Sequence, residues 1–167
     1  MSRFGRALRG VQSIALVGLG LLAAAPMAQV GERDMDALVG RMSTDEAARV
    51  ADLLGMCGGV YAAFSKFVEP QTPERALEYR ELSNGALTAG AYLLYREHRR
   101  RTGEARPVRE FMPRVAGRAE ASAAQAFAAF AAEDFDAAQE MLADCVKMEE
   151  MRTFLVDAMS AEMARPK

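Results

Sequence analysis

The spacing of apolar residues along the chain predicts long amphipathic helices. Between Thr44 and Val68 apolar side chains recur at steps of three and four residues, which places them on one face of a helix. The segments 73–101 and 135–163 repeat this spacing. No run of strand length alternates between apolar and polar positions, and isoleucine, a strand-favouring residue, is absent from residues 29–167. The chain is therefore predicted to be all-α.

Capping residues and helix breakers set the expected boundaries. Ser43 and Glu46 have the spacing of a capping box, in which each side chain bonds the backbone N–H of the other residue. Pro73 suits the first position of a helix, and Gly103 suits the residue after its end. The predicted helices cover residues 44–68, 73–101, from Pro107 or Pro113 to about Ala132, and 135–163, with a short lead-in helix over 34–42. Short connections between four helices predict an antiparallel up-down four-helix bundle.

The first 28 residues have the pattern of a signal peptide. Three arginines precede an uncharged stretch. The most hydrophobic part of this stretch, Ile14–Ala25, is shorter than the roughly 20 residues that a membrane span prefers. The expected cleavage point is Ala28–Gln29, and the alternative is an uncleaved anchor. The chain then divides into a signal segment over 1–28, a lead-in over 29–43 and a bundle over 44–165. This organisation predicts a periplasmic or secreted protein, or else one anchored in the inner membrane by its N-terminal segment.

Composition narrows the class of protein. The chain has 167 residues, of which 51% are hydrophobic and 26% charged, and its net charge is -2. These values are close to the averages for one globular domain. They disfavour a disordered tail, a collagen-like repeat and a polytopic membrane protein. A nucleic-acid-binding function is not expected either, because the net charge is slightly negative.

Cys57 and Cys145 are predicted to form a disulfide between the first and fourth helices. Cys57 lies 11 residues before the end of its predicted helix, and Cys145 lies 10 residues after the start of its own. In antiparallel neighbours rising about 1.5 Å per residue, the two heights nearly match. Disulfides persist in the oxidising compartments that exported proteins reach. The alternative is a pair of buried free thiols, while redox catalysis is not expected without a CxxC pair.

Small residues line another face of the first helix. Gly55, Gly59 and Ala63 are spaced by four residues, so they form a groove that lets another backbone approach closely. Asp52 and Lys66 flank this groove, which argues against a membrane span. We favour close packing against the alanine-rich third helix over the alternative, a docking groove or a pocket for an apolar ligand.

No metal or cofactor is predicted. Methionine can bind copper(I), but the methionines of the last helix mostly fall at core spacing, so copper carriage is the lesser alternative. These methionines are Met141, Met148, Met151, Met159 and Met163. His98 is the only histidine, and no zinc ligand set or CxxCH haem motif is present. We expect His98 near a helix C-terminus, where a positive group complements the helix dipole.

An arginine cluster is the most distinctive surface feature of the sequence. The candidate interaction surface comprises Arg96, Arg99, Arg100, Arg101, Arg106 and Arg109. Such a cluster suits an acidic protein partner or anionic phospholipid headgroups. Acidic residues gather near the start of the fourth helix, at the opposite end of the expected bundle, so the molecule is predicted to be polarised.

The sequence contains no recognisable catalytic constellation. GxSxG, HExxH and Gly-rich phosphate loops are all missing, and no histidine stands near a candidate nucleophile. We therefore expect no enzyme but a non-catalytic interaction module or accessory subunit of the cell envelope. Two alternatives stay open: a carrier of an apolar small molecule or copper in the bundle interior, and a membrane-anchored subunit of an envelope complex.

Overall fold

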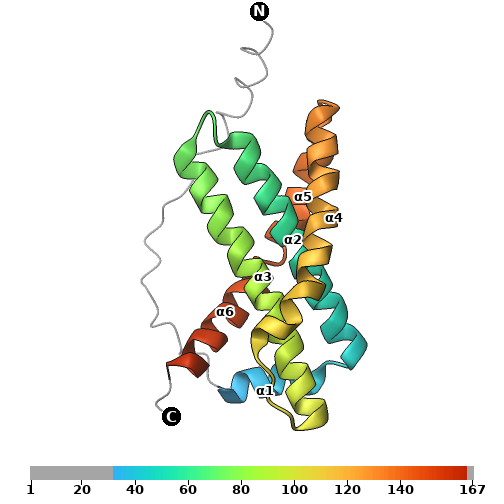
Figure 1. Ribbon diagram of the computed structural model, residues 1–167, viewed down its shortest axis with the longest axis vertical. Helices are drawn as coiled ribbons and strands as arrows, with labels where there is room; N and C mark the ends of the chain where they lie inside the picture. Colours follow the sequence, from blue (N-terminus) through green and yellow to red (C-terminus); the bar gives the residue numbers. More distant parts are fainter. Residues whose placement is uncertain (1–31, 165–167) are drawn as a thin grey trace, which may run out of the picture.

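The computed structural model describes residues 32–164, and all regular structure in this range is helical (Figure 1). The helices are α1 (Glu32–Arg41), α2 (Thr44–Val68), α3 (Pro73–Thr102), α4 (Met112–Ala131), α5 (Phe135–Val146) and α6 (Glu149–Met163), and a 3-10 turn, η2 (Val108–Phe111), precedes α4. The all-α prediction is confirmed for this part of the chain. The predicted signal peptide, residues 1–28, lies outside the described residues.

Local signals set the limits of α2 and α3. The Ser43 hydroxyl accepts a hydrogen bond from the Glu46 N–H at 3.2 Å, and the Glu46 carboxylate accepts one from the Ser43 N–H at 2.8 Å. This capping box satisfies backbone N–H groups that have no partner inside the helix. α3 begins at Pro73 and ends before Gly103, whose φ of 74° is the left-handed conformation that glycine adopts without strain. The α2 boundaries match those predicted from the sequence.

The expected fourth helix is divided into α5 and α6 by a turn at Lys147 and Met148. Six α-helices are therefore present among the described residues, and the four-helix bundle is not confirmed. No glycine or proline stands at the turn. The two halves have different partners: α5 packs on α2 and α4, whereas α6 packs on α3 and α1. A single straight helix could not serve both sets of contacts.

α2 is the central helix of the molecule. It packs extensively against both α3 and α4, and α5 lies against it as well (Figure 1). Among the described helices, α2 alone is long and apolar enough to cross a membrane, but 61% of its most apolar window is buried inside the protein. Its apolar character is therefore accounted for by its central position.

Glycines let the neighbouring helices approach α2 closely. A Cβ added at Gly55 would lie 2.7 Å from the Val115 carbonyl oxygen of α4, and a Cβ added at Gly59 would collide with the Ala119 carbonyl oxygen of the same helix. Gly58 faces α3 instead, where an added Cβ would lie 2.8 Å from the Leu87 side chain. Adjacent glycines thus serve two different interfaces.

Buried serines connect the backbones of these helices. Ser83 of α3 donates its hydroxyl hydrogen to the Gly58 carbonyl at 2.8 Å, and Ser122 of α4 donates to the Met56 carbonyl at 2.7 Å. Buried hydroxyls need partners, and a backbone carbonyl can accept a second hydrogen bond in addition to its helical one. Such bonds form only where the helices lie this close together.

Alanine at position 59 is expected to destabilise the protein by about 2 kcal/mol, because the added methyl group meets fixed backbone of α4. Gly117→Ala is the matched control, since a Cβ there meets nothing within 4 Å. That change should stabilise by about 0.5–1 kcal/mol, because alanine favours the helix more than glycine. Urea denaturation of both variants measures the difference. Equal effects of the two changes would contradict the close packing of α2 on α4.

Candidate functional site

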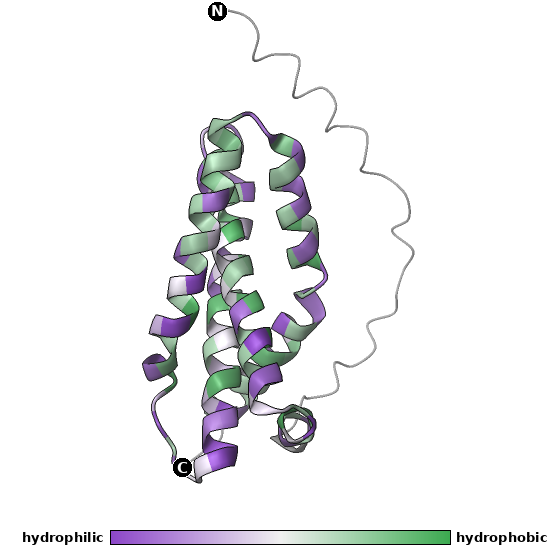
Figure 2. Cartoon of the chain, turned by 90° about the vertical axis from the view of Figure 1, so that its right-hand side faces the viewer, coloured by the Kyte–Doolittle hydropathy of each residue, from purple (hydrophilic) through white to green (hydrophobic). Residues whose placement is uncertain are grey.

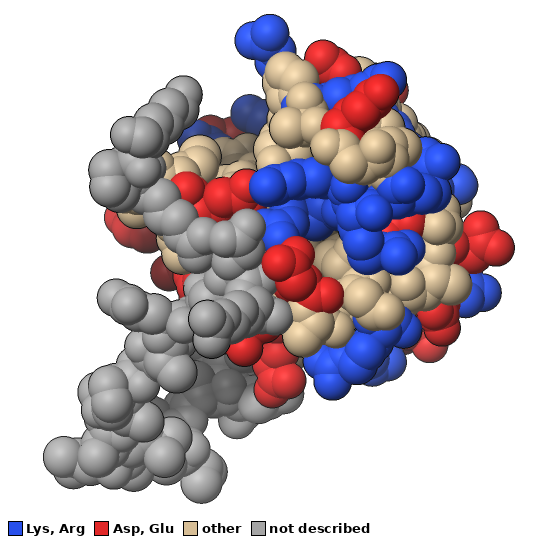
Figure 3. All heavy atoms as spheres, turned by 90° about the horizontal axis from the view of Figure 1, so that it is seen from below, with Lys and Arg blue, Asp and Glu red and all other residues tan. Residues whose placement is uncertain are grey.

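The predicted interaction residues gather at one end of the molecule, where α3 ends, η2 follows and α4 begins. We call this the arginine-rich end. Hydrophilic segments occur along the whole height of the molecule in Figure 2, including its lower end, and the view from below shows Lys and Arg side chains together, with carboxylates beside them (Figure 3). The acidic start of α5 lies at the opposite end, near the α4–α5 connection (Figure 1).

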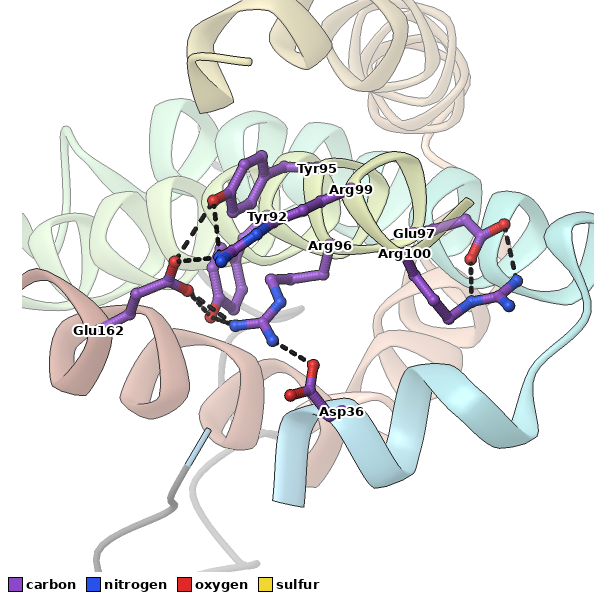
Figure 4. A network of polar contacts seen from close by, with 8 residues as sticks. All are labelled: Asp36, Tyr92, Tyr95, Arg96, Glu97, Arg99, Arg100 and Glu162. Carbon is purple, nitrogen blue, oxygen red and sulfur yellow. Dashed lines mark hydrogen bonds and ion pairs between the residues drawn. The ribbon is translucent and has the colours of Figure 1, made fainter. Parts of the chain in front are cut away.

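Arg96 is not part of this surface, contrary to the prediction. It is only 4% exposed and forms ion pairs with Asp36 of α1 and, at 2.9 Å, with Glu162 of α6 (Figure 4). Its guanidinium also donates to the Tyr92 hydroxyl at 3.3 Å. Hydrogen bonds from Arg96 to Tyr92, Asp36 and Glu162 outweigh burial, which alone would lower the pKa of Arg96, so this pKa is raised. One buried cation thus connects α3 with both α1 and α6.

Glu162 is the main acceptor in this network. Its carboxylate accepts from Tyr92 at 2.7 Å, Tyr95 at 3.3 Å, Arg96 at 2.9 Å and Arg99 at 3.4 Å (Figure 4). Burial by itself would raise the pKa of Glu162, but the hydrogen bonds from Tyr92 and Arg96 outweigh it and hold the pKa below its usual value. Since four donors share its oxygens, this carboxylate is poorly placed to act as a base.

A more deeply buried carboxylate, Glu97, joins α3 to the start of α2. Arg100 donates to its two oxygens at 2.8 and 3.1 Å, and the Thr44 hydroxyl donates at 2.6 Å. Burial would raise the pKa of Glu97, but the hydrogen bonds from Arg100 and Thr44 outweigh it, so the pKa is lowered. The bidentate pair also fixes the position of the Arg100 guanidinium at the edge of the arginine-rich end.

The other five predicted arginines are exposed. The side chains of Arg99, Arg100 and Arg106 are 42%, 43% and 53% exposed although each contacts a carboxylate. Arg101 and Arg109 are also exposed, and no carboxylate of the described residues lies within ion-pair distance of either. These five side chains form the exposed arginine face. Arg101 and Arg109 are the two members that form no ion pair within the described residues, although Arg101 also interacts electrostatically with Glu97.

The predicted disulfide is present. Cys57 of α2 and Cys145 of α5 are bonded, with 5.2 Å between their Cα atoms, and both are buried. The bond lies in a core cluster that also contains Tyr61 and Phe64 of α2. It fastens α5, the first half of the expected fourth helix, to the central helix.

The small-residue face of α2 is occupied within the protein. Gly55 and Gly59 lie against α4, and Ala63, one turn further on, is fully buried. This arrangement corresponds to the close-packing interpretation. No room remains there for the docking groove or ligand pocket considered as the alternative.

The methionines of the last segment are mostly part of the core. Met148, Met151 and Met159 are partly buried against the core cluster that contains Leu54, Tyr92 and Leu155, while Met163 is largely exposed. His98 lies near the C-terminal end of α3, and its ring contacts that of Phe111 with 5.6 Å between centroids. Within the range that the structure describes, no group of three His, Cys, Asp or Glu side chains could hold a metal ion.

Asp36, Glu162 and the tyrosines of α3 are site residues that the sequence did not single out. One signal was available for Arg96 itself: it lies three residues after Leu93, on the apolar seam of α3, and so points inward. Its partners lie 60 and 66 residues away along the chain, a separation for which helical spacing provides no rule.

Comparisons with protein-family models, with curated proteins and with solved structures find no match to this chain.

Proposed function

We propose that this protein is a small, exported, non-catalytic interaction module or accessory subunit of the cell envelope, and that its exposed arginine face docks on an acidic protein. The observation that carries the proposal is the grouping of five exposed arginines at one end, two of which form no ion pair among the described residues. Guanidinium groups match carboxylates in a bidentate geometry, which suits recognition of Asp and Glu side chains.

The mixed charge of this end favours a protein over a membrane surface. Glu104 and Glu110 are exposed among the arginines, and carboxylates are visible beside the basic side chains in Figure 3. A uniform layer of anionic headgroups would repel these carboxylates. A protein partner can place acids opposite the arginines and avoid Glu104 and Glu110.

Two features support export. The N-terminal segment has the charge and apolar pattern of a signal peptide, and the Cys57–Cys145 disulfide is of the kind that persists in an oxidising compartment. Mass spectrometry of protein taken from cells after thiol blocking tests this part. A chain that begins at Gln29 with neither thiol blocked supports export. An intact N-terminus supports the anchored alternative, and blocked thiols argue against export.

Site-specific photo-cross-linking in the producing cells tests the docking face. We expect a photoreactive residue at Arg109 to yield a discrete protein adduct, and the same residue at Gln139, exposed on α5 at the opposite end, to yield none. The Arg101→Glu change should abolish the adduct, whereas Arg75→Glu, an exposed arginine near the start of α3, should leave it. The adduct should also weaken at high salt, which screens exposed charges.

Two outcomes would contradict the docking proposal. One is an adduct that forms equally from positions 109 and 139. The other is an adduct that survives Arg101→Glu unchanged. Cross-links to lipid alone would indicate a membrane surface instead of an acidic protein.

A further inference from the structure

A surface hollow lies far from the arginine-rich end. It occupies about 440 Å³ in the upper half, where α3 and α4 flank the last turns of α2 (Figure 1). Hollows of this size are in the range of small-molecule sites. The residues that line it are Ala62, Ser65, Lys66, Arg80, Ser83, Asn84 and Phe127. We call it the upper groove.

Arg80 is held in a fixed position on the wall of this groove. Its Nε donates to the Ser65 hydroxyl at 3.2 Å, and its Nη2 is paired with the Glu69 carboxylate. Ser65 is buried and donates its own hydrogen to the Ala76 carbonyl at 2.9 Å, so the hydroxyl that accepts from Arg80 is itself held in place. These contacts leave Nη1 of Arg80 available to a ligand, and the cost of ordering a long side chain is already met.

The groove carries an excess positive charge. Lys66 and Arg80 both contact Glu69, and the ammonium of Lys66 uses one of its three hydrogens for this contact, at 3.2 Å. Two cations therefore share one carboxylate, and a single negative charge in the groove would balance them. Asn84, exposed at the rim, adds an amide that can donate to an anion.

An apolar surface adjoins these cations. Ala62 lies on α2, and Phe127 of α4 is 44% exposed although it is a large aromatic side chain. Contact with an apolar ligand would remove this surface from water, which is favourable. The groove thus combines two cations and an apolar wall.

We propose that the upper groove binds a small organic monoanion, with its carboxylate or sulfonate between Arg80 and Lys66 and its apolar body against Ala62 and Phe127. This inference goes beyond the docking function and is independent of it, because it uses different residues at the other end of the molecule. Binding here would add a ligand-responsive site to an interaction module.

The probe for this site is 4-phenylbutanoate, titrated into the isotope-labelled full chain and followed by ¹H–¹⁵N NMR. Shifts are expected at the amides of Ala62, Ser65, Asn84 and Phe127. Its alcohol analogue, 4-phenylbutan-1-ol, has the same apolar body without the charge and should bind about tenfold more weakly. This comparison needs no variant and is unaffected by changes in folding.

Two variants locate the anion. Arg80→Gln should weaken binding of 4-phenylbutanoate about tenfold, whereas Arg75→Gln, an exposed arginine on the same helix and outside the groove lining, should change it less than about twofold. Equal binding of the acid and the alcohol would overturn the proposal. So would an unchanged affinity in Arg80→Gln, or shifts confined to residues 99–109. The first two results would not bear on docking at the arginine face.

Discussion

Loss of the Cys57–Cys145 disulfide is expected to lower the free energy of unfolding by about 4–5 kcal/mol. The bond joins residues 88 apart in sequence, and closing a loop of this length removes much conformational freedom from the unfolded chain. The total stability of a domain is usually only about 5–15 kcal/mol, so the reduced protein should be marginally folded. α5 should be destabilised most, because it is short and its remaining contacts with the core are made mainly by Ala138, Met141 and Leu142.

Urea denaturation of the oxidised protein and of the Cys57→Ala/Cys145→Ala variant measures this contribution. Treatment of the double variant with a reductant should change nothing, which controls for other effects of the reagent. Amide hydrogen exchange should accelerate in α5 more than in α6, since α6 packs on α3 and α1. A loss of unfolding free energy below about 1 kcal/mol, or an equal increase in amide exchange in α5 and α6, would show that the disulfide is not the main interaction that holds α5 in place.

Replacement of Arg96 by methionine should cost about 3 kcal/mol. Methionine fills part of the same volume but leaves Glu162 without its buried cationic partner and Tyr92 without a donor. Removing one member of a buried ion pair is more damaging than removing both, because the remaining charge stays desolvated. Asp36 is less affected, since its side chain is well exposed to water. Arg99→Gln, at the exposed edge of the same network, should cost less than about 1 kcal/mol.

A double variant separates lost pairing from lost packing. Arg96→Met combined with Glu162→Leu removes both charges and should be more stable than Arg96→Met alone. Urea denaturation of the four proteins in this cycle gives the coupling energy directly. If the double variant were no more stable than the single one, the buried ion pair would not be the source of the loss.

The effect of Arg96→Met should also depend on pH. The pKa of Glu162 lies below the value of 4.5 expected without interactions, so Glu162 stabilises the protein above that pH and loses this contribution as the pH falls through its folded-state pKa. In the variant one of the groups that lower this pKa is missing. The stability gap between the two proteins should therefore be widest near neutral pH and should narrow in acid.

Helix limits that depend on neighbouring residues could be predicted from the sequence. The capping box at Ser43 and Glu46 and the proline at position 73 act within one turn, so they determine where α2 and α3 begin. The disulfide could be predicted as well, because matched heights and opposite helix directions bring the two cysteines together. The turn between α5 and α6 could not, since no breaker stands at Lys147 or Met148 and competing tertiary contacts produce it.

The site was harder to predict than the fold. An arginine cluster in a sequence does not indicate which of the arginines form ion pairs with carboxylates in the folded protein. Arg96 and Arg101 look alike in the sequence, yet one is buried against Asp36 and Glu162 and the other is exposed. The upper groove left no pattern at all, because Ser65, Arg80 and Phe127 come from three helices that meet only after folding.

The contact between Asp36 and Arg96 has a consequence for orientation. It holds α1, which begins at Glu32, beside the arginine-rich end (Figure 1). If the N-terminal segment were retained as an anchor, the tether would keep the arginines close to the lipid headgroups and restrict which partners could approach. Cleavage after Ala28 would remove this constraint and leave the arginine face free to turn toward any acidic protein. Proteolytic processing would then decide the direction in which the molecule faces as well as its location.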